Sequence, residues 1–429
     1  MKIYLDMVGC RLNQSEIESL AQKFLAAGHE IVSTAGNADL AVINTCAVTG
    51  EASSDSRQKI RQIARLGSAR VVVTGCWATL DPKGAASLPA VEQVVLNDRK
   101  DDLVENLFGR LDGVCDSRPF SRQPLPGLRM RTRSFIKIQD GCDNRCAYCV
   151  AVLARGPARS HPVEAVMADV LSALAGEVKE VVLTGMHLAS WGSEFGLCLR
   201  ELVAALLSGT DVPRLRLSSL EPWDLDADFF SLWRDPRLCR QLHLPLQSGS
   251  ATVLKRMRRK VTPVSFARLV KAARSAVPEM AITTDVIVGF PGESEAEFGQ
   301  TMDFVRRMDF AGGHVFTYSA RPGTEAARLP GQIHASVRKE RNAVLRNIFK
   351  EQAFAYNSHF LGSRLNVLWE SSEKIGNEEW RLSGLTDNYI RVEAVSTAPI
   401  WNQFSTVELV RSTEDGLFGK ICLPDGHPA

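Results

Sequence analysis

Short apolar runs alternate with longer helical patterns over the first 112 residues of the chain. Four of the apolar runs predict buried strands: residues 2–8, 39–44, 70–74 and 91–96. Residues 15–27 and 52–66 repeat apolar positions three and four apart, which predicts helices, with Ser15 as a cap of the first and Gly28 as its stop. This order of strands and helices predicts a parallel sheet with helices on both of its faces.

Between residues 128 and 358 the alternation of strand and helix continues with a longer repeat. Six strand-like runs recur there: residues 135–139, 180–184, 214–218, 241–245, 281–288 and 314–319. Helical patterns separate them, so we expect a partial (β/α)6 barrel whose ligands bind at the C-terminal ends of the strands.

The pattern changes again at residue 359, where alternating runs become short, turns become frequent and no helix is indicated. The runs at 364–369, 389–395 and 406–410 predict a small β-barrel. A chain of 429 residues is too long for one ordinary core. The three patterns together predict an α/β protein with domains at residues 1–112, 128–358 and 359–427.

Composition narrows the class of protein. The chain has 45% hydrophobic and 23% charged residues, and no run approaches the roughly 18 apolar residues of a membrane span, so we expect a soluble protein with no membrane partner. Residues 1–6 lack the long apolar region of a secretory signal, which favours the cytoplasm. Thiols stay reduced in that compartment, so grouped cysteines are better explained as metal ligands than as disulfides.

Charge is informative only locally, because the formal net charge is +2. Residues 117–139 contain no acidic residue but several basic ones: Arg118, Arg122, Arg129, Arg131, Arg133 and Lys137. Such a run suits either a solvated linker or contact with the phosphates of a nucleic acid. Residues 360–429 carry 6 Lys and Arg against 10 Asp and Glu, a net of −4, which is opposite to what phosphate binding favours.

Three cysteines, Cys142, Cys146 and Cys149, follow the strand-like run 134–139 with the spacing C-x3-C-x2-C. Three thiolates on one short loop can hold three irons of a 4Fe–4S cluster and leave the fourth iron open to a ligand. Zinc is the alternative, but it prefers four closed ligands, and no second pair of cysteines or histidines follows. The spacing therefore favours an iron–sulfur cluster with an open, catalytic position.

A second set of cysteines, Cys10, Cys46 and Cys76, follows the ends of three predicted strands of the first domain. Ligands bind at that edge of open α/β sheets. One such cysteine alone would be explained as a buried hydrophobic residue, but three at matching strand ends favour a second three-cysteine cluster. The other four, Cys115, Cys198, Cys239 and Cys422, have no partner spacing and are predicted to be structural.

The loop around Cys142, with Tyr148 just before its last cysteine, resembles that of radical S-adenosylmethionine (SAM) enzymes. Three N-terminal segments, 9–16 (GCRLNQSE), 43–46 (INTC) and 74–76 (TGC), resemble the signatures of the methylthiotransferases within that superfamily. The resemblance covers nearly the whole chain. It implies two 4Fe–4S clusters, one on Cys142, Cys146 and Cys149 and an auxiliary one on Cys10, Cys46 and Cys76, with SAM as radical source and methyl donor.

The same resemblance implies a set of SAM contacts at the strand ends: Tyr148, Gly185, Met186, His187, Glu221, Gln247, Arg259, Gly289, Phe290 and Pro291. Considered without the resemblance, residues 289–292 would serve equally well as a tight loop. His187 and His243 could be structural histidines that are hydrogen-bonded inside the barrel. Residues 384–392 (GLTDNYIRV) resemble the TRAM domain, an RNA-binding barrel.

Residues 257–262 (MRRKVT) and 386–389 (TDNY) resemble most the branch acting on N6-threonylcarbamoyladenosine at position 37 of tRNA. We therefore expect methylthio transfer to carbon 2 of that base, with Arg259 or an arginine of the 117–139 run facing the substituent's carboxylate. Alternatives are isopentenyladenosine tRNA, a ribosomal protein aspartate, or an RNA-binding iron–sulfur sensor without turnover. The enzyme would need tRNA, an electron donor such as flavodoxin or ferredoxin, and a sulfur source as partners.

Overall fold

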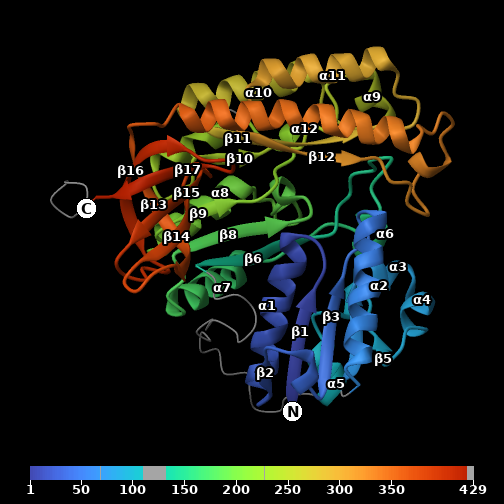
Figure 1. Ribbon diagram of the computed structural model, residues 1–429. Coiled ribbons are helices and arrows are strands. Elements are labelled where there is room, and N and C mark those ends of the chain that lie inside the picture. Colours follow the sequence, from blue (N-terminus) through green and yellow to red (C-terminus); the bar gives the residue numbers. More distant parts are fainter. Residues whose placement is uncertain (68, 110–131, 227, 423–429) are drawn as a thin grey trace.

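A five-stranded parallel sheet in the order β2–β1–β3–β4–β5 forms the N-terminal part of the computed structural model, which describes residues 1–67, 69–109, 132–226 and 228–422 (Figure 1). The strands are β1 (Lys2–Met7), β2 (Glu30–Val32), β3 (Leu40–Thr45), β4 (Arg70–Gly75) and β5 (Val91–Val94). The helices are α1 (Arg11–Ala26), α2 (Gly50–Arg65), α3 (Cys76–Leu80), α4 (Pro82–Ala86) and α5 (Leu103–Phe108).

Helices cover both faces of this sheet, as the alternation of β3 shows. Val42 packs in one buried cluster with Phe24 of α1, whereas its neighbour Ile43 packs in another with Ile60 of α2. The predicted parallel sheet is confirmed. The predicted cap of the first helix is wrong, because α1 begins at Arg11 and Ser15 lies buried inside it.

Six parallel strands form the central part: β6 (Arg133–Asp140), β8 (Glu180–Gly185), β9 (Leu215–Leu217), β10 (Gln241–His243), β11 (Ala281–Val288) and β12 (Gly312–Thr317). They make two sheets, β7–β6–β8–β9 and β10–β11–β12, in which the short β7 (Arg159–Ser160) runs antiparallel to β6. Isolated bridges, including Ser219 with His243, join the end of β9 to the next sheet. The predicted partial (β/α)6 barrel is confirmed.

Seven helices belong to this central part of the described chain: α6 (Ala151–Arg155), α7 (Val163–Ala175), α8 (Leu199–Gly209), α9 (Ala251–Arg256), α10 (Pro263–Ala276), α11 (Glu295–Met308) and α12 (Ala335–Ser358). One large buried cluster fills the space between the strands and their helices, with Leu183, Leu217 and Ile282 among its members. No helix of the described chain is both long and apolar enough to cross a membrane.

A closed barrel in the order β13–β14–β15–β17–β16 ends the described chain (Figure 1). Its strands are β13 (Arg364–Lys374), β14 (Trp380–Thr386), β15 (Arg391–Ser396), β16 (Phe404–Ser412) and β17 (Leu417–Ile421). The sequence indicated three of these strands; β14 and β17 were not foreseen, although their alternation is visible once the barrel is known. The predicted α/β fold with a terminal barrel is confirmed.

Arginines of the central part fasten this terminal barrel through backbone carbonyls. Arg214 donates to the carbonyl oxygens of Leu385 (2.9 Å) and Asn366 (3.1 Å). Arg216 donates to those of Asp387 (3.0 Å) and Thr386 (3.1 Å), and it also pairs with Glu180 at 2.7 Å. The side chains of Arg216 and Glu180 are both fully buried, so the turn at 386–389 has a docking role.

Candidate active site

The loop that carries Cys142, Cys146 and Cys149 begins where β6 ends, at Gly141. Gly141 has φ +69°, and a Cβ there would collide with the carbonyl oxygen of Pro157, so only glycine fits the turn. The backbone N–H of Cys142 donates to the carbonyl of Gly156 (3.1 Å), which closes the loop against the end of α6. The predicted cysteine loop therefore lies at the C-terminal edge of the barrel strands.

Hydrogen-bond donors point at two sulfur atoms of this loop. The backbone N–H of Asn144 lies 3.4 Å from the Sγ of Cys142, and the Nη1 of Arg259 lies 3.9 Å from the Sγ of Cys146. Burial, together with the nearby thiols of Cys146 and Cys142, raises the pKa of Cys149 to about 11. Three thiols that lie close together, with hydrogen-bond donors near their sulfur atoms, fit a thiolate-bound 4Fe–4S cluster.

Arg259 and Glu221 lie together beside this loop. The guanidinium donates to both carboxylate oxygens of Glu221, at 3.1 and 2.7 Å, and to the carbonyl of Pro245 at 2.7 Å. It also stacks 4.4 Å from the ring centroid of Trp223. Since the Arg259 side chain is only 1% exposed and already paired, it fits a role at the cluster and SAM end of the site better than the predicted role at the base substituent.

His187 occupies a buried position between Asn144 and Asp224. Its Nε2 lies 2.6 Å from Asp224, and Asn144 contacts the ring at 3.3 Å. Burial alone would lower the pKa of His187, but hydrogen bonds to Asp224 and Cys142 raise it to about 9. His187 therefore orients the cysteine loop.

Gly185 and Gln247 both lie where one backbone segment packs closely against its neighbour. A Cβ on Gly185 would lie 3.0 Å from Gln139, whose Oε1 accepts from the backbone N–H of His187 (2.8 Å). Gln247 has φ +72° and exchanges backbone hydrogen bonds with β11. Met186, between Gly185 and His187, is half-buried.

Residues 289–291 form the tight loop that their glycine suggested, and they also support the cysteines. Gly289 has φ +69° and donates its N–H to Glu293 (2.7 Å). Phe290 is fully buried in one cluster with Ala147 and Tyr148 of the cysteine loop. The predicted SAM contacts at these positions remain predictions.

Cys10, Cys46 and Cys76 converge at the C-terminal edge of the N-terminal sheet. Cys10 caps α1, Cys46 follows β3 and Cys76 opens α3 directly after β4. Gly9 has φ +108°, and a Cβ there would lie 2.7 Å from the Sγ of Cys46, so only glycine lets these segments approach. Burial, together with the nearby Cys10 and Cys76, raises the pKa of Cys46 to about 11. The donor set fits the predicted second cluster.

A pocket of about 200 Å³ lies between the two sets of cysteines. Cys149 and Gln247 line it from the barrel side, and Val48 and Thr49, just after Cys46, line it from the N-terminal side. Asp285 adds the only carboxylate among its lining residues in the described chain, and Phe316 adds an aromatic wall. The pocket therefore lies beside Cys149 of one set and beside the segment that follows Cys46 of the other.

A buried ionic network, which the sequence analysis missed, joins the two cysteine sites. Arg155 donates to Glu16 (2.8 Å), to Asp140 (2.9 Å) and to the Oδ1 of Asn13 (2.9 Å). Asn13 follows Cys10 by three residues, and Asp140 directly precedes the Gly141 turn. Lys100 completes the network by pairing with Glu16 at 2.8 Å. Burial would raise the pKa of Glu16, but Lys100 and Arg155 hold it well below its ordinary value.

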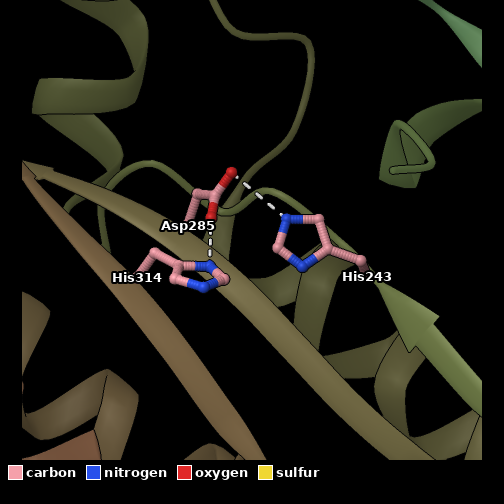
Figure 2. A group of neighbouring side chains, drawn as sticks. All are labelled: His243, Asp285 and His314. Carbon is pink, nitrogen blue, oxygen red and sulfur yellow. Dashed lines mark hydrogen bonds and ion pairs between the residues drawn. The ribbon is translucent and has the colours of Figure 1, made fainter. Parts of the chain in front are cut away.

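A second missed group consists of His243, Asp285 and His314, on neighbouring strands β10, β11 and β12 (Figure 2). Asp285 lies between the two histidines, 3.1 Å from His243 and 3.2 Å from His314. The sequence motifs contained His243 and Asp285, but His314 carried no motif that the analysis used.

The remaining predictions fall partly outside the described residues. Cys115, Arg118, Arg122, Arg129 and Arg131 lie there, together with the predicted boundaries at 112, 128 and 427. Within the described chain, Arg133 pairs with Glu370 at 2.6 Å and Lys137 lies 3.7 Å from Asp140. Cys198 is exposed, Cys239 is buried and Cys422 is half-buried.

Comparisons with known proteins agree with this arrangement. Residues 2–97 match the uncharacterized protein family UPF0004, and residues 136–305 match the radical SAM superfamily. The radical SAM methyltransferase TsrM of Kitasatospora setae has a similar fold, with a TM-score of 0.58, 16% identity and 76% of each chain covered.

Relatives along the full length are more similar in sequence. The threonylcarbamoyladenosine tRNA methylthiotransferase of Thermotoga maritima is 36% identical, with 97% of this chain and 96% of that protein covered. The corresponding enzyme of Bacillus subtilis is 35% identical, over 94% of this chain and 93% of that protein. A tRNA-2-methylthio-N(6)-dimethylallyladenosine synthase of Caldicellulosiruptor saccharolyticus is 30% identical, over 96% of this chain and 91% of that protein. The chain therefore belongs to the radical SAM methylthiotransferases, enzymes that work with SAM and 4Fe–4S clusters.

Proposed function

We propose that this enzyme transfers a methylthio group to carbon 2 of N6-threonylcarbamoyladenosine at position 37 of tRNA. Four relatives that bear the threonylcarbamoyladenosine name are 33–36% identical to the chain, and three that bear the dimethylallyladenosine name are 30–31% identical. The difference favours the first substrate class.

The observation that carries the transfer reaction is the pocket between Cys149 and the loop that follows Cys46. Methylthio transfer needs one carbon atom within reach of both a radical source and a sulfur donor. Bound on the two cysteine sets, the clusters and SAM would supply radical formation, a methyl group and a sulfur atom. Cys142, Cys146 and Cys149 would hold the first cluster, and Cys10, Cys46 and Cys76 the second.

The protein's own residues bind and orient the base. Ile287 and Phe316 give the pocket apolar walls, while Gln247 and Asp285 offer polar groups to a base edge. Proteins read RNA mainly at unpaired loop bases, which can be turned out of a stack. A narrow pocket with these walls suits one such base and keeps water from the reacting carbon.

The test uses purified, anaerobically reconstituted enzyme with SAM, a reductant such as flavodoxin or ferredoxin, and a sulfide source. Three tRNAs carry threonylcarbamoyladenosine, isopentenyladenosine or adenosine at position 37, and nucleoside mass analysis identifies the products. We expect methylthio product mainly from the first tRNA. Preference for the isopentenyl tRNA would overturn the substrate, and inactivity on all three would redirect the proposal to a protein substrate.

A further inference from the structure

The His243–Asp285–His314 cluster forms a chain of hydrogen bonds across three strands (Figure 2). The Nε2 of His243 lies 3.1 Å from one oxygen of Asp285, and the Nδ1 of His314 lies 3.2 Å from the other. Asp285 and His314 are directly paired residues in the register of β11 and β12. Each carboxylate oxygen of Asp285 therefore holds one imidazole ring.

His243 is fixed at its other nitrogen as well. Its Nδ1 lies 2.9 Å from the Oγ1 of Thr283, which faces it across the β10–β11 pair. Burial would raise the pKa of Asp285, but hydrogen bonds from His243 and His314 outweigh burial and hold it well below its ordinary value. Asp285 therefore stays ionised and positions both rings.

The remaining nitrogen of His314, Nε2, is exposed. Its side chain is 71% exposed, and within the described residues its Nε2 has no hydrogen-bond partner. Phe316, two residues further along β12 and on the same face, lines the pocket between the cysteine sets, as does Asp285. The Nε2 of His314 is therefore exposed next to a residue that lines this pocket.

A second cationic side chain, that of Arg11, lies where the N-terminal part meets the terminal barrel. Arg11, directly after Cys10, donates to the hydroxyl of Tyr389 at 2.7 Å. Among the described residues it has no carboxylate within salt-bridge distance. The hydrogen bond to Asp285 raises the pKa of His314, whereas burial and the positive charge of Arg11 lower it.

We infer that His314 and Arg11 together bind the carboxylate of the base's N6 substituent, with Asp285 and His243 as positioning residues for His314. The inference rests on the proposed function, because a threonylcarbamoyl group carries a carboxylate and an isopentenyl group carries only hydrocarbon. Charge-assisted hydrogen bonds from an imidazolium and a guanidinium are the strong contacts that such an anion makes. The base would then lie in the pocket, and its substituent would extend toward Arg11.

Two histidines and one aspartate also resemble the ligand set of a divalent metal site. Here each oxygen of Asp285 already has its own histidine, and His243 is bound at both nitrogens. These contacts favour a positioned cation over a metal ligand set, and metal analysis decides between them.

The experiment compares two anticodon stem-loop RNAs, one with threonylcarbamoyladenosine and one with its methyl ester, which lacks the negative charge. The reconstituted enzyme and its His314→Gln and Arg11→Gln variants are assayed for kcat/KM on both. Matched controls are His359→Gln and Arg346→Gln, two exposed residues of the α12 region outside the pocket lining. Equilibrium binding of both RNAs gives a readout that does not depend on turnover.

We expect the wild type and both controls to prefer the free carboxylate by roughly 10- to 100-fold, the usual value of a hydrogen bond to a charged group. His314→Gln and Arg11→Gln should each reduce that preference to within a few-fold of unity, in binding as well as in kcat/KM. Asp285→Asn should reduce it too, because His314 then loses its anionic support.

Three results would overturn the inference. Equal losses on both RNAs in the His314 and Arg11 variants would show a merely structural role. A divalent ion present in equimolar amount in the wild type and absent from Asp285→Asn would show a metal site. A wild type that modifies the threonylcarbamoyl RNA without preferring it over the ester would refute the carboxylate contact alone, whereas a wild type inactive on both would refute the proposed function.

Discussion

Replacing Arg155 with methionine should loosen the junction between the two cysteine sites. The guanidinium makes hydrogen bonds to Glu16 at 2.8 and 3.2 Å, to Asp140 at 2.9 and 3.1 Å and to Asn13 at 2.9 Å. Its side chain is 1% exposed and that of Glu16 is 2% exposed, so solvent cannot replace these contacts. Methionine would fill part of the volume but would leave two carboxylates without their main partner.

The size of the loss in stability depends on the ion pairs that Glu16 and Asp140 keep in the variant. Breaking a buried ion pair by removing one partner typically costs about 3–5 kcal/mol. Glu16 would keep Lys100 at 2.8 Å, and Asp140 would keep Lys137 at 3.7 Å. We therefore expect a loss of local stability at the lower end of that range, about 3 kcal/mol. This loss corresponds to a roughly 100-fold more frequent local opening of the segments around Glu16 and Asp140.

Hydrogen exchange followed by mass spectrometry measures this opening directly. Peptides covering residues 10–20 and 134–142 should exchange roughly 100-fold faster in Arg155→Met, and less so in Arg155→Lys, which keeps the charge. Arg346→Met, an exposed change on α12, serves as the control. Methylthio product should fall more than 5′-deoxyadenosine, because sulfur transfer depends on both sites. Exchange within twofold of the wild type in both peptides would refute the reasoning.

Three further predictions concern the cysteines and the terminal barrel. Anaerobic reconstitution should give about eight irons per chain, and replacing Cys142, Cys146 and Cys149 together with alanine should leave about four; a wild-type plateau near four irons would contradict the second cluster. Cys76→Ala should still cleave some SAM to 5′-deoxyadenosine but form no methylthio product, and product at the wild-type rate would remove Cys76 from the auxiliary site. Burial would raise the pKa of Glu180, but Arg216 lowers it to about 2, so this carboxylate contributes stability above its unfolded value of 4.5 and loses it as the pH falls toward 2. Denaturant unfolding followed by tryptophan fluorescence at pH 6 and pH 3 should therefore show a smaller acid loss in Glu180→Gln, and equal losses would contradict that role.

The arrangement of the cysteines could be predicted because it depends on strand ends. Apolar runs located the strands before Cys10, Cys46 and Cys76, and a parallel sheet brings those ends to one edge. The spacing of Cys142, Cys146 and Cys149 is local and needed no tertiary information. The tight turn at Gly289 is also local, and it could be predicted because glycine favours such turns.

Features that depend on distant partners could not be predicted in this way. Arg155 and Glu16 are 139 residues apart, and no pattern in either segment indicates the other. The start of α1 was misplaced because its first turn contains the polar residues Arg11 and Asn13, so the apolar period begins only later. His314 lies in a strand whose alternation was recognised, but its partner Asp285 belongs to another strand.

The carbonyl contacts of Arg214 and Arg216 affect how the terminal barrel can diverge during evolution. Four of their hydrogen bonds end on main-chain oxygens of residues 366 and 385–387, which exist whatever side chains those residues carry. Asp387 also makes a side-chain contact, to Arg240 at 2.7 Å. The outer surface of the barrel can therefore accumulate substitutions while its orientation relative to the pocket is inherited unchanged.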